Sequence, residues 1–183
     1  MGTVTVLAAL ALAACGNGSD KESASADHNR ADVTFAQGMI PHHEQAIEMA
    51  DLAATRASDP QVKALATQIG IAQDPEMTKM TGWLKNWGEP TSDPGSEGHG
   101  GTSGHAGSGM MSDADMDKLA GLSGKAFDME FLTMMTTHHK GAIEMARTEQ
   151  ADGRYGPAKQ LAASIIKSQS AEVAFMAELL KGR

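Results

Sequence analysis

The chain has 183 residues, only 4% of them aromatic, and a formal net charge of −8 at pH 7. This length suits one domain, and frequent Ala, Leu, Met, Glu, Gln and Lys favour helices over strands. An acidic chain without clustered Lys and Arg is a poor ligand for nucleic acid, so we expect no such partner.

The first segment predicts export. Residues 4–14 form an apolar run that is too short to span a bilayer but fits the core of a signal peptide. It ends in Leu-Ala-Ala before Cys15, as in bacterial lipoproteins, although no Lys or Arg precedes it; a buried helix start is the alternative. We predict a lipoprotein signal peptide over residues 1–15, a lipidated Cys15 and a flexible tether over 16–31. The protein would then lie outside the cytoplasmic membrane or on its periplasmic side, with the lipid anchor as its only membrane contact.

An internal repeat organises the rest of the chain. Residues 32–85 align with residues 128–181 without gaps, and 19 of the 54 positions are identical. We therefore predict one duplicated helical domain over 32–183. It divides into a first repeat (32–87), a linker rich in Gly, Ser, Pro and His (88–111), a short helix (112–122) that Ser112 caps, and a second repeat (125–183).

Each repeat is predicted to form two helices. In the first repeat they cover about 32–55 and 60–87, separated at Asp59 and Pro60, and Gly153 and Gly156 make the same break in the second. Pro41 and Pro75 lie inside the helical pattern and predict a kink or a local break. Two helical hairpins give an all-α fold, a four-helix bundle of ferritin-like type, with the short extra helix in the connection.

The inward faces of these helices carry metal-binding side chains. At 100° per residue, the His-His pair and two methionines of the first helix lie on or beside its apolar stripe, and the second repeat has the same pattern. The candidate metal ligands are Met39, His42, His43, Met49, Met135, His138, His139 and Met145. The partner helices add supporting groups or further ligands at Gln73, Glu76, Met80, Gln169, Glu172 and Met176, and the two glutamates would accept hydrogen bonds from imidazoles or bind the ion directly.

Copper is the metal that this donor set favours, because imidazole and thioether together suit it, with zinc or iron as alternatives. The other interpretation is a structural polar network in a Met-filled core. In the linker, His99, His105, Met110 and Met111 are either auxiliary ligands or a solvated spacer. Whether each hairpin holds its own site or both share one stays open.

The repeated pattern Asp-x-x-Phe-x-x-x-Met-x-x-His-His-x-x-Ala-Ile-Glu-Met-Ala resembles a bacterial family called domain of unknown function 305, over residues 32–181. The resemblance implies an exported ferritin-like bundle, and copper binding or copper resistance through the Met and His ligands above. We expect copper sequestration without turnover, with a copper-delivery protein as a second partner. A metal-dependent oxidase and a purely structural module are the alternatives.

Overall fold

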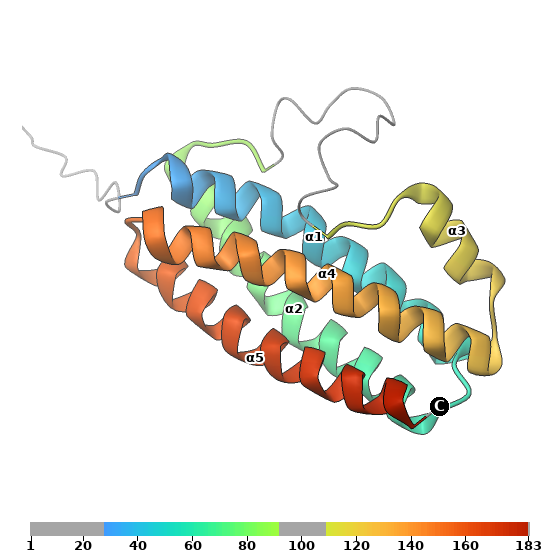
Figure 1. Ribbon diagram of the computed structural model, residues 1–183. Helices are drawn as coiled ribbons and strands as arrows, with labels where there is room; N and C mark the ends of the chain where they lie inside the picture. Colours follow the sequence, from blue (N-terminus) through green and yellow to red (C-terminus); the bar gives the residue numbers. More distant parts are fainter. Residues whose placement is uncertain (1–27, 92–108, 183) are drawn as a thin grey trace, which may run out of the picture.

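The computed structural model describes residues 28–91 and 109–182, and every regular element within them is a helix. The elements are α1 (Arg30–Arg56), α2 (Pro60–Trp87), α3 (Asp113–Gly121), α4 (Gly124–Asp152) and α5 (Gly156–Lys181). The four long helices form a bundle and α3 lies in the connection (Figure 1), which confirms the predicted fold class. The predicted signal peptide, Cys15, most of the tether, and His99 and His105 of the linker lie outside the described residues.

Side-chain caps set the starts of three helices. Asp59 caps α2 ahead of Pro60, and Ser112 caps α3, both as the sequence predicts. The start of α1 differs from the expectation. The Asn29 side chain accepts hydrogen bonds from the backbone N–H groups of Ala31 and Asp32, and the Asp32 carboxylate accepts one from the Asn29 N–H at 2.6 Å. Because of this reciprocal cap, α1 begins at Arg30, inside the segment expected to be tether.

Prolines do not interrupt the helices that contain them. Pro41 lies within α1 and Pro75 within α2, and both helices continue past them. Neither proline makes the local break that was one of the two expected outcomes. The repeat has Thr137 and Ala171 at the equivalent positions, so α4 and α5 keep the backbone N–H that proline lacks.

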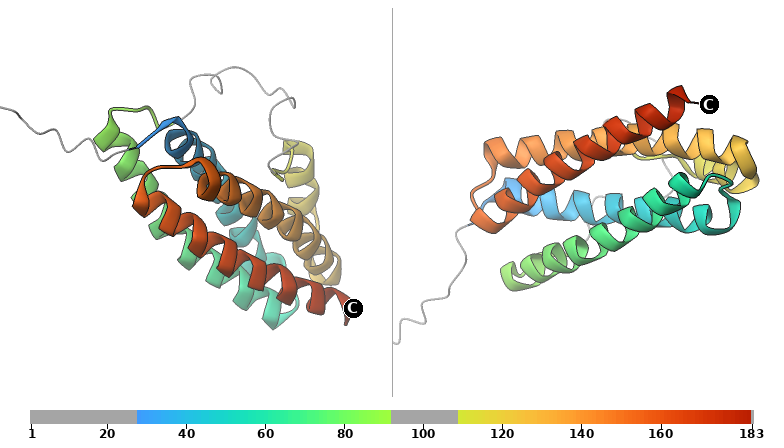
Figure 2. Two further views of the ribbon diagram at one scale, coloured as in Figure 1. Left: turned by 60° about the vertical axis from the view of Figure 1, so that its left-hand side comes forward. Right: turned by 90° about the horizontal axis from the view of Figure 1, so that it is seen from below.

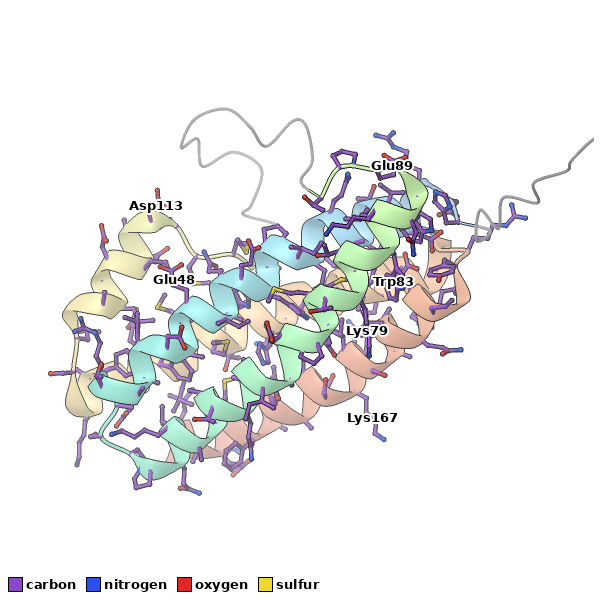
Figure 3. All side chains as sticks on the ribbon, turned by 180° about the vertical axis from the view of Figure 1, so that it is seen from behind. Glu48, Lys79, Trp83, Glu89, Asp113 and Lys167 are labelled. Atoms are coloured by element: carbon purple, nitrogen blue, oxygen red, sulfur yellow. The ribbon has the colours of Figure 1, made fainter. Side chains whose placement is uncertain are left out.

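The two hairpins, α1 with α2 and α4 with α5, meet chiefly through α1 and α4, which lie side by side and run in opposite directions (Figures 1 and 2). Side chains fill the space between the four helices, whereas Glu48, Lys79 and Lys167 are exposed on the outside (Figure 3). None of the helices in residues 28–91 and 109–182 has an apolar stretch long enough to cross a membrane.

Two buried aspartates tie each hairpin to the other. Asp32, at the start of α1, accepts hydrogen bonds from the N–H groups of residues 154 and 155 in the α4–α5 loop, at 3.0 and 2.8 Å. Asp128 accepts them from residues 58 and 59 in the α1–α2 loop, at 3.0 and 3.2 Å. The two aspartates occupy equivalent positions of the repeat, and so do the two loops. The two halves of the chain are therefore related by an approximate twofold axis.

Candidate metal centre

Two histidines meet where α1 contacts α4. The ring centroids of His42 and His138 are 3.7 Å apart, the ring planes are inclined by 37°, and both side chains are buried. They occupy the same position of the repeat, and equivalent positions on two antiparallel helices come together at the twofold centre. The two repeats therefore bring their histidines into one cluster in the middle of the bundle.

The neighbouring histidine of each repeat bonds to a glutamate on its partner helix. The His43 Nε2 lies 2.7 Å from an oxygen of Glu76 on α2, and the His139 Nε2 lies 2.6 Å from an oxygen of Glu172 on α5. Both imidazoles are fully buried, while the glutamates are partly exposed. When Nε2 donates its proton to the carboxylate, Nδ1 keeps its lone pair, and a carboxylate behind the ring is how proteins orient a metal-binding imidazole.

Several buried polar atoms of this cluster have no hydrogen-bond partner within the described part of the chain. They include Nδ1 of His43 and of His139 and both ring nitrogens of His138. The side-chain oxygens of Gln73 and Gln169 are also buried without a hydrogen-bond partner in the described residues. Leaving a buried polar atom unpaired costs about 1–3 kcal/mol, so such a concentration of them points to a ligand that they would share.

The electrostatics of the cluster keep His138 neutral. Burial is the main cause, followed by the proximity of His42, His139 and His43, and together they hold the pKa of His138 well below its usual range. A neutral imidazole retains the lone pair that a metal requires. The ring is therefore in the protonation state in which it can bind an ion.

Methionines lie on both sides of the histidines. Of the six predicted as ligands or supporting groups, five are fully buried and Met145 is partly buried. They divide between two core clusters, Met39, Met80 and Met145 in one and Met49, Met135 and Met176 in the other.

Each cluster therefore contains methionines from both hairpins. Met145 of α4 lies against α1, where a Cβ placed on Gly38 would stand 3.6 Å from its sulfur. Met49 of α1 likewise shares a core cluster with Met135 of α4 and Met176 of α5. The physical reason is that α1 and α4 are antiparallel. A residue two turns after the histidine of one helix therefore lies beside residues that precede the histidine of the other.

The donor set is soft and nitrogen-rich. Across residues 28–91 and 109–182, no group of three or more His, Cys, Asp or Glu side chains is arranged to hold an ion by itself. The candidate donors are the unpaired imidazole nitrogens and the methionine sulfurs of the two core clusters. Such a set fits a copper ion better than an ion that needs several carboxylates.

A second buried polar feature, which sequence reasoning missed, lies at the end of the bundle. Burial raises the pKa of Glu149 to about 8, aided by the neighbouring Asp32 and opposed by Lys159. Burial also acts to raise the pKa of Asp32, but backbone N–H donors and Glu149 lower it below its usual value. Glu149 is therefore protonated at neutral pH, while Asp32 is an anion. The one signal in the sequence was a Glu at a buried position where the other repeat has Ala53.

Fold and cluster together define a duplicated helical bundle with a buried centre of histidine and methionine. Residues 32–180 match the family described as domain of unknown function, DUF305, and the chain belongs to this family.

Three comparisons illustrate the relationship. A DUF305 protein of Streptomyces coelicolor that carries a provisional description as secreted is 36% identical, with a TM-score of 0.74 over 83% of this chain and 93% of that one. CopM in its Cu(I)-bound form is 30% identical, with a TM-score of 0.68 over 82% of this chain and 96% of CopM, and it is also known in Cu(II)-bound and silver-bound forms. An uncharacterized protein of Acanthamoeba polyphaga mimivirus is 43% identical over 53 residues, and the match covers 29% of this chain and 35% of that relative.

Proposed function

We propose that this protein binds copper outside the cytoplasm and sequesters it, through the buried cluster that both repeats share. His42, His43, His138 and His139 supply the nitrogen donors, and the flanking methionines supply sulfur. In this proposal the chain is exported and anchored through a lipidated Cys15, and it buffers copper or passes it to a partner protein. Glu76 and Glu172 orient the imidazoles.

The observation that carries the proposal is the set of unpaired imidazole nitrogens in a fully buried centre. His43 and His139 are fixed by their glutamates, yet each leaves Nδ1 without a partner among the described residues. A purely structural network would be expected to use these atoms, because an unpaired buried donor or acceptor destabilises the fold.

Copper is chosen over other metals on two grounds. Thioether sulfur combined with imidazole suits Cu(I) and, through imidazole, Cu(II). CopM, which shares this fold at 30 to 32% identity, carries both ions in its solved forms. Iron oxidation is not favoured, because ferritin-like iron centres draw carboxylates from all four helices, and the glutamates beside this cluster are already bonded to imidazoles.

The test is a titration of the full chain carrying Cys15→Ser, so that no thiol competes for the metal. Cu(I) and Cu(II) affinities are measured by competition with a coloured chelator. The double variant His42→Ala, His138→Ala should bind copper about tenfold to a hundredfold more weakly, because it loses the central pair of donors. His28→Ala is the matched control, since His28 stacks on Trp87 outside the cluster and its loss should leave both affinities unchanged.

Two results would contradict the proposal. If the double variant binds copper as tightly as its parent, the metal is held elsewhere, for instance by His99 and His105 of the linker. If the parent itself binds no copper at micromolar concentration, the histidines belong to a structural core. Circular dichroism of each variant establishes that the helices are intact.

A further inference from the structure

Residues 109–111, the end of the linker, lie across the outside of the bundle, and we call this segment the strap. Gly109 has a positive φ of 76°, and a Cβ on it would stand 2.5 Å from the carbonyl oxygen of Thr137 and 3.2 Å from the Cα of Gly141. The strap backbone therefore touches α4 so closely that both contacting positions, 109 and 141, lack a side chain. Only glycine combines this close approach with the left-handed conformation.

A glutamine on α1 holds the other end of the strap. The Nε2 of Gln45 donates to the carbonyl oxygen of Met111 at 2.9 Å, and the Met111 N–H donates to Oε1 of Gln45 at 2.7 Å. One side chain thus satisfies both backbone groups of one residue. Gln45 and Gly141 are equivalent positions of the repeat. The strap accordingly bridges α1 and α4 at matched points on either side of the twofold centre.

The strap lies on the same helix faces as the central histidine pair. His42 is three residues before Gln45, and His138 is three residues before Gly141, so each histidine shares a face with its strap contact. The two rings lie against each other between the helices, with their planes inclined by 37°. The strap carries two thioethers, those of a half-buried Met110 and of Met111, which packs against the core cluster containing Met49.

We propose that the strap is part of the metal site, and that its methionines supply thioether donors to a soft monovalent ion held by His42 and His138. The inference rests on the proposed function and deepens it, because it assigns Cu(I) rather than Cu(II) to this position. Thioethers bind Cu(I) well and contribute little to Cu(II). The ion would be held from within by imidazoles and from outside by the strap.

The experiment compares the double variant Met110→Leu, Met111→Leu with Met129→Leu, a matched change at an exposed methionine of α4. Leucine keeps the volume and apolar character of methionine but has no sulfur. The double variant should lose about tenfold in Cu(I) affinity, while its Cu(II) affinity changes by less than about threefold. X-ray absorption at the copper edge should show fewer sulfur neighbours for Cu(I) in the double variant and no change in Met129→Leu.

Gln45→Ala tests the same inference without removing any methionine. It should weaken Cu(I) binding in the same direction, and in the metal-free protein it should speed hydrogen exchange of the Met111 amide, which loses its acceptor. This variant also covers the case in which the double leucine variant fails to fold.

The outcomes separate the two proposals. If the strap variants keep the parent's Cu(I) affinity and sulfur neighbours while His42→Ala with His138→Ala loses binding, the strap is only a connection, and the proposed function stands. If the parent binds no copper, both proposals are overturned.

Discussion

Glu149 shows how a single side chain makes the fold sensitive to pH. Glu149 is only 1% exposed, and its charge would interact with those of Asp32 and Lys159. Asp32 is already held as an anion by backbone N–H groups of residues 29, 154 and 155. A second negative charge beside it in a buried place is unfavourable, so Glu149 keeps its proton in the folded state.

We therefore expect the free energy of unfolding to fall as pH rises through the window set by Glu149. An unfolded glutamate loses its proton near the ordinary pKa of 4.5, whereas the folded one keeps it up to about 8. Between these values the folded state binds one more proton, so stability decreases by up to about 1.4 kcal/mol per pH unit and levels off above the folded pKa. Urea unfolding from pH 5 to 9 measures the slope.

Glu149→Gln should remove this part of the pH dependence, because the amide is close in size to the carboxylic acid and carries no titratable proton. Glu144→Gln, an exposed change on the same helix, is the control and should follow the parent curve. Parallel curves for the parent and Glu149→Gln would show that Glu149 is ionised in the folded protein.

At the scale of helices and loops, an aspartate from the other hairpin fixes the conformation of the α1–α2 loop. Asp128 accepts from two backbone N–H groups and from the Ser58 hydroxyl, at 3.0, 3.2 and 2.5 Å. All these bonds join segments about seventy residues apart. The α1–α2 loop thus depends on α4 for its conformation, and the α4–α5 loop depends on α1 in the same way.

Asp128→Ala should lower the free energy of unfolding by about 2–4 kcal/mol, because it leaves buried donors without an acceptor and removes a charged hydrogen-bond partner. Asp128→Asn keeps one acceptor oxygen and should cost less. Asp51→Ala, an exposed change on α1, should stay within about 0.5 kcal/mol of the parent. Urea unfolding at neutral pH checks the order, and equal losses for Asp128→Ala and Asp51→Ala would refute the role of the loop contact.

The elements themselves could be predicted from the sequence, because their signals are local. A helical period, the Asp59–Pro60 start of α2 and the Ser112 cap of α3 fix where the chain turns, and the apolar stripe fixes that His42 faces inward. The bonds of Glu76 and Glu172 to imidazoles followed from the same reasoning within one hairpin.

What lies between the hairpins could not be predicted. A helical wheel gives the direction of a side chain but not the helix that it meets. The close approach of the His42 and His138 rings, the packing of Met49 beside Met135 and the burial of Glu149 beside Asp32 all depend on how α1 docks against α4. That geometry is set by packing over the whole contact rather than by any short motif.

For the whole molecule, the proposed metal site links the stability of the fold to copper binding. Unpaired nitrogens in the middle of the bundle destabilise the metal-free fold, and an ion that binds only the folded state restores stability in proportion to its concentration over its dissociation constant. The cluster joins both repeats, so its state affects the two hairpins together.

His138→Leu should raise the free energy of unfolding of the metal-free protein by about 1–2 kcal/mol, since both of its unpaired ring nitrogens are replaced by apolar atoms. Addition of Cu(I) at a hundred times its dissociation constant should stabilise the parent by about 2.7 kcal/mol and the variant much less. Thermal unfolding with and without Cu(I) measures both effects. A metal-free His138→Leu protein that is less stable than its parent would assign the ring a structural role.

The reciprocal aspartate contacts have one more consequence. Two halves that exchange the same contact about a twofold axis have the geometry of an isologous homodimer, here joined into one polypeptide. In a true homodimer every mutation appears twice, on both sides of the axis. A fused pair is free of that constraint, and each half can specialise while the shared centre keeps its symmetry. Two positions depart from the symmetry in this way, Gln45 with Gly141 and Ala53 with Glu149. The first pair gives only α1 a side chain that bonds to the strap, and the second gives only α4 a buried titratable group.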